Sequence, residues 1–175
     1  MFAVWYLTAP VILWPVELIV DAVLRGGFGE LVRSVAAQGS TIQVVSSLKP
    51  GQAVAGGSVI VDVNMLLYAF GLPMFAALVV AAHEPRWPRV LAIGYAVMLP
   101  FIAWGVVAEF LKNVAVTAGP LVTSQAGFSA TQREAVVFAF QFGSLILPTV
   151  VPAAIWVLSH RAFLERLRAQ SLEAR

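Results

Sequence analysis

The sequence predicts an all-α polytopic membrane protein with four transmembrane helices, proline bends and a small β-hairpin-like loop on the outer side. Composition is the first reason, because 60% of the 175 residues are hydrophobic and 11% are charged, whereas a soluble domain is about 25% charged. Length is the second, because a run of about 18 apolar residues crosses a bilayer as a helix. We expect one membrane domain over 1–175, with spans at about 2–24, 65–82, 90–111 and 135–158.

Proline inside each run is the third observation. Proline in a helix removes one backbone hydrogen bond and clashes with the carbonyl one turn earlier, so the helix bends. Membrane bundles tolerate such bends where neighbouring groups satisfy the freed carbonyl. The prolines concerned are Pro10, Pro15, Pro73, Pro100, Pro148 and Pro152. We predict bent spans, with Pro73 and Pro100 near the middle of the bilayer.

The first run is interpreted as a retained span. A signal peptide has a basic n-region, a short apolar core and a small-residue cleavage site. Here no Lys or Arg precedes Phe2, the apolar run is long, and no Ala-x-Ala sequence ends it.

Basic residues beside the spans predict the orientation. Arg86 and Arg89 lie between the second and third runs, and further arginines follow the fourth run. The positive-inside rule assigns such segments to the cytoplasm. Both termini are then expected in the cytoplasm, and the segments 25–63 and 112–134 are expected outside.

The first outer segment is expected to have structure of its own. Gly26–Gly29 would end the first helix, and Glu30–Ala37 would form a short surface helix. Thr41–Val45 and Ser58–Val63 are rich in β-branched residues, which is typical of strands joined by a loop. A lone hairpin is marginal in water, so it is expected to rest on the membrane, on the second outer segment or on a partner.

The second outer segment and the C-terminal tail carry weaker patterns. Ser129–Gln132 fits a capping box that opens the fourth helix. The segment before it either lies along the interface or dips back into the bundle. The tail, 161–175, forms either an amphipathic helix on anionic headgroups or a solvated extension.

Polar side chains within the spans are the candidates for a site, because charged groups in hydrocarbon are costly and face the bundle interior or a cavity. Glu17, Asp21 and Arg25 are four residues apart and share one helix face. In the predicted topology all candidates fall in the outer leaflet, where the proline bends would gather them beneath the β-rich loop. The set is Glu17, Asp21, Arg25, Asn64, Glu109, Lys112 and Gln141.

Three interpretations of this set stay open. The first is a structural cluster, such as Glu17 and Asp21 with Arg25 or Lys112. The second is a site for a ligand or a partner peptide. The third is a proton or ion path, although no acidic or histidine relay continues into the inner leaflet.

Known enzyme and metal motifs are missing from the sequence. Zero cysteines exclude thiolate chemistry. His83-Glu84 has no second histidine one turn later, and no Gly-x-Ser-x-Gly sequence occurs. A net charge of +2 without a basic stripe argues against nucleic acid. We expect no catalytic residue, no metal and no cofactor.

Two stretches resemble the exosortase H-associated membrane proteins of bacteria. They are Asn64–Pro73 and Ala139–Gly143 with Pro148 and Pro152 behind it, although Phe140 stands where a tyrosine is expected. The order of one span, an outer β-rich loop and three further spans is similar as well. The matching positions are Asn64, Tyr68, Gly71, Pro73, Gln141, Gly143 and Pro148.

The resemblance implies an inner-membrane companion of an exosortase, the membrane enzyme that processes C-terminal sorting signals. It implies a non-enzymatic accessory or scaffold protein whose partners are the bilayer and an exosortase or its substrate. The alternatives are a small transporter or channel that uses the acidic residues of the first span, and a membrane enzyme that uses Glu17, Asp21 or Glu109.

Overall fold

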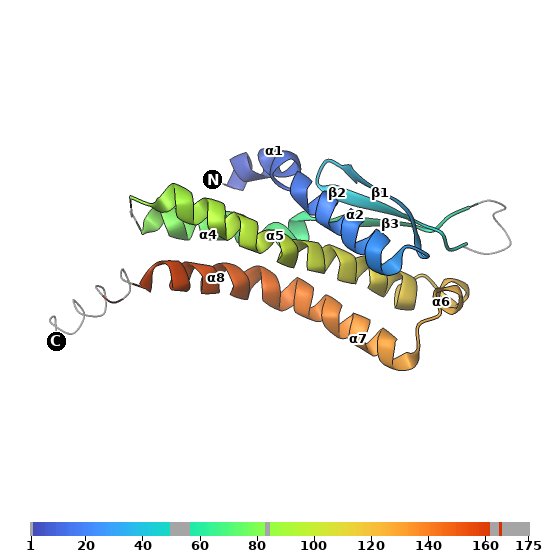
Figure 1. Ribbon diagram of the computed structural model, residues 1–175. Helices are drawn as coiled ribbons and strands as arrows, with labels where there is room; N and C mark the ends of the chain where they lie inside the picture. The colour runs from blue at the N-terminus through green and yellow to red at the C-terminus, as the bar shows by residue number, and fades with distance from the viewer. Residues whose placement is uncertain (1, 50–56, 83–84, 162–164, 166–175) are drawn as a thin grey trace.

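The computed structural model describes residues 2–49, 57–82, 85–161 and 165. The described chain is mostly helical and carries one small antiparallel sheet (Figure 1). In chain order the elements are α1 (Phe2–Ile12), α2 (Trp14–Phe28), β1 (Val32–Gln38), β2 (Thr41–Ser46), β3 (Ile60–Asn64), α3 (Leu66–Ala69), α4 (Gly71–Ala81), α5 (Trp87–Lys112), the π-helix η1 (Asn113–Thr117), α6 (Pro120–Ala126), α7 (Ala130–Gln141), the π-helix η2 (Phe142–Ile146) and α8 (Leu147–Ser159).

Two helices of the described chain are long and apolar enough to cross a membrane. They are Trp87–Thr117 and Ala130–Ser159. Val4–Ile12 and Trp14–Phe28 meet at 41° and give a third span if the bent pair counts as one. The second predicted run forms a shorter apolar helix, Leu66–Ala81. Length and composition therefore support two to three of the four predicted spans.

The sharp bend in the first run lies at Leu13, between α1 and α2. The Leu13 N–H still donates to the Ala9 carbonyl at 2.8 Å, whereas the Val16 N–H donates to the Leu13 carbonyl at 2.9 Å, three residues back. Pro15 stands between them and has no N–H to continue the α-helical ladder. The predicted proline bend is therefore present here.

The prolines of the other long helices are accommodated differently. Pro100 lies inside an uninterrupted α5. Pro148 is the second residue after the π-helix η2, and a π turn widens the backbone where the proline ring would otherwise crowd the preceding carbonyl. The Ser144 hydroxyl donates to the Phe140 carbonyl at 2.8 Å within this turn.

The segment after α2, which was predicted to lie outside, folds into the sheet, with the strand order β1-β2-β3. Both predicted strands are present, and they pair antiparallel as Ile42 with Val63 and Val44 with Val61. These four side chains are buried on one face of the sheet. The predicted hairpin therefore forms two of the three strands.

The predicted surface helix over Glu30–Ala37 is wrong, because this stretch contains most of strand β1. Val35 pairs with Val44 of β2, so the long-range ladder overrides the local helical preference. The predicted helix stop at Gly26–Gly29 is confirmed, because α2 ends at Phe28 with Gly29 as its C-cap. Gly39, with a φ of 65°, makes the tight turn from β1 to β2, and such a φ favours glycine.

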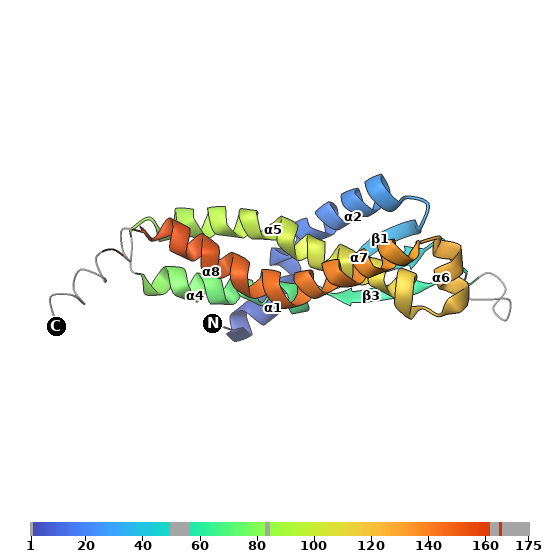
Figure 2. The same ribbon diagram turned by 90° about the horizontal axis from the view of Figure 1, so that it is seen from below.

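Helix α5 is central and packs against α2, α4, α7 and α8. Figure 1 shows α5 between the α7–α8 helix and the layer that contains α2 and the sheet. The ends of α4 and α8 and the start of α5 lie together at one end of the molecule. The sheet and α6 lie at the opposite end (Figures 1 and 2).

The segment between α5 and α7, which was also predicted to lie outside, contains η1 and α6 and contacts the loop that leaves β2. The Lys49 N–H donates to the Gln125 side-chain oxygen at 3.0 Å, and the Gln125 side-chain N–H donates to the Lys49 carbonyl at 3.1 Å. The expected support of the β-rich loop by this segment is thus present. The predicted capping box is confirmed, because Ser129 and Gln132 exchange side-chain to backbone hydrogen bonds at 2.9 and 3.3 Å.

The predicted amphipathic tail, 161–175, lies outside the described residues except for Arg161 and Glu165. It stays a prediction.

Candidate functional site

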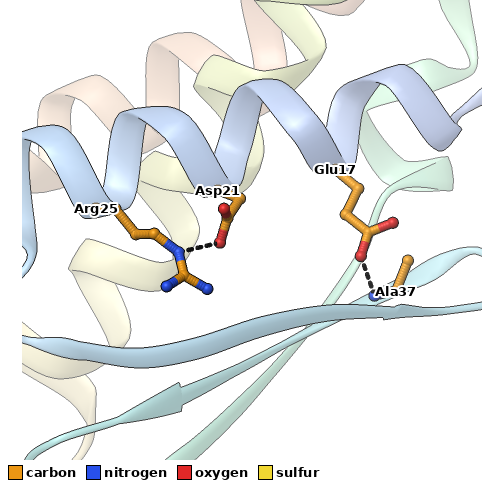
Figure 3. Close-up of polar contacts among 4 residues, drawn as sticks. All are labelled: Glu17, Asp21, Arg25 and Ala37. Carbon is orange, nitrogen blue, oxygen red and sulfur yellow. Dashed lines mark hydrogen bonds and ion pairs between the residues drawn. The ribbon is translucent and has the colours of Figure 1, made fainter.

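The polar residues of the first span lie on α2 and face strand β1 (Figure 3). Asp21 Oδ1 and Arg25 Nε form an ion pair at 2.6 Å. Glu17 accepts a hydrogen bond from the backbone N–H of Ala37 at 2.8 Å. The three side chains share one helix face as predicted, and that face is turned toward the sheet.

The Glu17 carboxylate provides a hydrogen-bond partner for a backbone N–H on the β1 edge of the sheet. The Ala37 N–H points away from β2 and toward α2. A backbone N–H withdrawn from water is costly unless it has a partner, and the Glu17 carboxylate supplies that partner. Lys112 does not join this group, because its Nζ lies 4.0 Å from the centroid of the Phe140 ring, in cation–π geometry.

A second polar contact joins α3 to α5. The Tyr68 hydroxyl donates to Glu109 Oε2 at 2.7 Å. The Tyr68 side chain is 3% exposed, so this bond satisfies the one polar atom of a buried ring. Nearby, the Asn113 side chain donates to the Glu109 carbonyl at 3.0 Å, and Asn64 Oδ1 accepts from the Leu66 N–H at the start of α3.

Three glycines let the helices around this contact approach closely, and we call them the glycine crossing: Gly71, Gly105 and Gly143. A Cβ on Gly71 would lie 2.4 Å from the Pro148 carbonyl oxygen. A Cβ on Gly105 would lie 2.1 Å from Tyr68 Cδ1, and one on Gly143 would lie 3.2 Å from Gly105 Cα. Only glycine fits Gly71 and Gly105 without a shift of their neighbours.

The glycine crossing brings together residues from the two stretches noted in the sequence. Tyr68 and Gly71 come from the first stretch, and Gly143 and Pro148 from the second. Gly105 of α5 lies between them, and sequence reasoning missed it. Its one signal was a glycine inside an apolar run, four residues before Glu109.

The crossing is packed rather than hollow. The cavity between α4, α5 and α8 measures about 10 Å³ and is lined by Tyr68, Gly71, Met98 and Pro148, among others. That volume holds one water molecule at most. The helices therefore meet in close contact at the glycine crossing.

The remaining candidates lie elsewhere. Gln141 lines an open groove of about 640 Å³ between η1, α6 and α7, together with Arg133 and Glu134. Pro73 lines a groove of about 430 Å³ that also contains Trp5 of α1. The expected gathering of all seven polar residues into one cluster is therefore not present. The reason is that α2 turns its polar face to β1, while Glu109 and Lys112 find partners on other helices.

The described polar residues offer structural contacts more than reactive ones. Among residues 2–49, 57–82, 85–161 and 165, no three His, Cys, Asp or Glu side chains gather to hold a metal ion. Glu17, Asp21 and Glu109 each bond a group of the same chain. What the arrangement does is fix α2 to the sheet and α3 to α5.

A family comparison covers nearly the whole chain. The family described as exosortase H-associated membrane protein matches residues 1–163. The chain belongs to this family. No curated protein and no solved structure matches it. As a member of the exosortase H-associated family, it is a membrane protein, and the family name links it to an exosortase system.

Proposed function

We propose that this protein is a non-catalytic accessory subunit that binds an exosortase in the bacterial inner membrane and holds it in a defined arrangement. The observation that carries the proposal is that the acidic groups are used within the chain: Glu17 and Glu109 bond neighbouring elements, and Asp21 pairs with Arg25 of its own helix. A carboxylate that holds a sheet or a tyrosine in place serves the fold. Family membership supplies the kind of partner.

Large apolar side chains on the outer faces of the helices support a role in the membrane. Trp14 is 59% exposed, Trp104 is 50% exposed and Phe138 is 69% exposed. Such side chains contact lipid or the helices of another membrane protein. No specific observation favours a transporter or an enzyme over this function.

The proposed topology has four spans and cytoplasmic termini. Leu66–Ala81 is then a short span, because 16 helical residues rise about 24 Å and a short span is accommodated by local thinning of the bilayer. The ends of α4 and α8 lie at the same end of the molecule (Figure 1), which agrees with one cytoplasmic side for the basic segments next to them.

Cysteine labelling tests this topology, because the natural chain has none. In intact spheroplasts, a membrane-impermeant maleimide is expected to label Ala36→Cys on β1 and to leave Ser159→Cys at the end of α8 unlabelled until the membrane is opened. Labelling of both from outside would contradict the four-span arrangement.

Co-purification tests the function. The tagged protein, co-expressed with the exosortase from the same genome, is expected to retain it through size-exclusion chromatography in a mild detergent. An unrelated four-span protein with the same tag serves as the control. A wild-type protein that migrates alone in every mild detergent, with the exosortase recovered elsewhere, would refute the proposal.

An amide variant separates the accessory role from a chemical one. Glu17→Gln, Asp21→Asn and Glu109→Gln combined keep an oxygen acceptor at each position but remove the charge. An accessory subunit is expected to co-purify as the wild type does and to support sorting in the cell. Loss of sorting with an intact complex would instead point to proton, ion or catalytic chemistry at these carboxylates.

A further inference from the structure

One edge of the three-stranded sheet carries unpaired backbone groups. The Met65 N–H donates to the Ser40 carbonyl at 2.9 Å, and the Val59 N–H donates to the Leu48 carbonyl at 3.2 Å. Both bonds run toward the β2 side. Because neighbouring residues of a strand point their backbone groups to opposite sides, the N–H and C=O groups of Ile60 and Asp62 point away from β2. In the described chain nothing bonds these N–H groups.

The two edges of the sheet differ in whether their outward-pointing N–H groups have a hydrogen-bond partner. The β1 edge lies beside α2, where Glu17 accepts the Ala37 N–H. Figure 2 shows β1 next to α2 and β3 on the opposite margin of the sheet. No fourth strand pairs with β3 in the described chain, because the strand order is β1-β2-β3. One face of β3 is solvated, since Ile60 is 55% exposed and Asp62 is exposed, while Val61 and Val63 are buried on the other face.

The position of this edge indicates which partner reaches it. Strand β3 ends at Asn64, and α3 begins at Leu66, with the Leu66 N–H bonded to Asn64 Oδ1 at 3.0 Å. In the proposed topology the β3 edge therefore lies directly outside the membrane. A chain that leaves its own membrane helix in an extended conformation passes this edge without a linker.

Charge adds a second constraint on the partner. Asp62 Oδ1 accepts a hydrogen bond from the side chain of Gln43 on β2 at 3.0 Å, so one carboxylate oxygen is used across the β2–β3 pair and the second carries no hydrogen bond in the described chain. A lysine or arginine on an added strand would lie next to Asp62, as opposite charges do across paired strands.

We propose that the β3 edge binds an extended, basic juxtamembrane segment of the exosortase as a fourth strand. Main-chain hydrogen bonds at Ile60, Asp62 and Asn64 hold the segment, and the Asp62 carboxylate pairs with its basic side chain. The inference rests on the proposed accessory function and names the contact through which it acts.

A proline substitution tests the edge without touching the β2–β3 ladder. Asp62→Pro removes an N–H that faces away from β2, and edge strands tolerate proline at such a position. The matched control, Asp62→Ala, removes the carboxylate but keeps the N–H. With both full-length variants in lipid nanodiscs, Asp62→Pro is expected to weaken exosortase binding by about tenfold or more relative to Asp62→Ala. The thermal unfolding temperature of the isolated Asp62→Pro variant is measured as well, and a value equal to that of the wild type shows that the fold is intact.

Site-directed crosslinking gives an independent measurement. Single cysteines at Ile60 or Asp62 are labelled with a photo-crosslinker before the purified exosortase is added, and Ala36→Cys on the β1 edge is the control. Crosslinks from positions 60 and 62, but not 36, to a segment next to a membrane helix of the exosortase are expected.

The outcomes distinguish failure of the β3-edge proposal from failure of the proposed accessory function. If the exosortase binds the wild type and Asp62→Pro equally, or crosslinks only from position 36, the edge proposal fails and the accessory function stands. Crosslinks at position 62 between two copies of this chain would assign the edge to self-association and also overturn it. If the wild type binds no exosortase, both proposals fail.

Discussion

Replacement of Gly71 by alanine is expected to destabilise the protein by about 1–3 kcal/mol, the usual cost of overpacking. The added Cβ would lie 2.4 Å from the Pro148 carbonyl oxygen and 2.5 Å from Pro152 Cγ. Both neighbours are stiff, because one is helix backbone and the other is a proline ring. Helices α4 and α8 must therefore separate. Reversible SDS unfolding in mixed micelles measures the change.

The matched control is Gly26→Ala in α2. Nothing lies within 4 Å of a Cβ at this position, so the substitution only removes the conformational freedom of glycine. Its expected effect is a gain of about 0.5–1 kcal/mol. The two identical substitutions thus have opposite signs. Equal stability of Gly71→Ala and the wild type would show that α4 and α8 do not meet this closely.

Removal of the Tyr68 hydroxyl is the second large effect we expect. Tyr68→Phe keeps the ring against Gly105 but takes from Glu109 the donor that bonds its carboxylate at 2.7 Å. A hydrogen bond to a charged group contributes about 1.5–3 kcal/mol, so a loss of this size is expected in the same unfolding assay. The control, Tyr6→Phe, changes a side chain that is 63% exposed. The free energy of unfolding is expected to change little.

A double-mutant cycle assigns this loss to the pair. Glu109→Gln retains an oxygen acceptor and is expected to cost less than Tyr68→Phe. Once Tyr68 is phenylalanine, Glu109→Gln is expected to cost little more or to be favourable, because it replaces an uncompensated charge with a neutral amide. Strictly additive losses would mean that the two side chains do not interact.

Local patterns predicted those parts of the fold that depend on near neighbours in the chain. The capping box needs only Ser129 and Gln132, three residues apart, and it formed as predicted. The β-branched run from Thr41 predicted a strand because such side chains pack well on a pleated surface. The run from Glu30 was predicted as helix, since nothing local reveals that β2 will pair with it.

In the candidate site, too, contacts between near neighbours in sequence were predictable and contacts between distant segments were not. The four-residue spacing of Glu17, Asp21 and Arg25 predicted their common face, and the ion pair within that face formed. The partner of Glu17 was not predictable, because Ala37 is twenty residues away in sequence and contributes only its backbone N–H. Gly105 was missed because it carries no chemical group, and its role is the space that it leaves for Tyr68.

By itself, the sequence determined that this chain enters a membrane, that a β-rich segment interrupts its helices and that the first proline-bearing run bends. Hydrophobicity, β-branching and the missing N–H of proline act within a few residues, so they can be read along the chain. Only the tertiary structure decided which face of α2 meets the sheet, which glycines admit a neighbouring helix and which edge strand is left open. Those features arise where segments distant in sequence come within a few ångströms, and side-chain volume and hydrogen-bond pairing then select one arrangement.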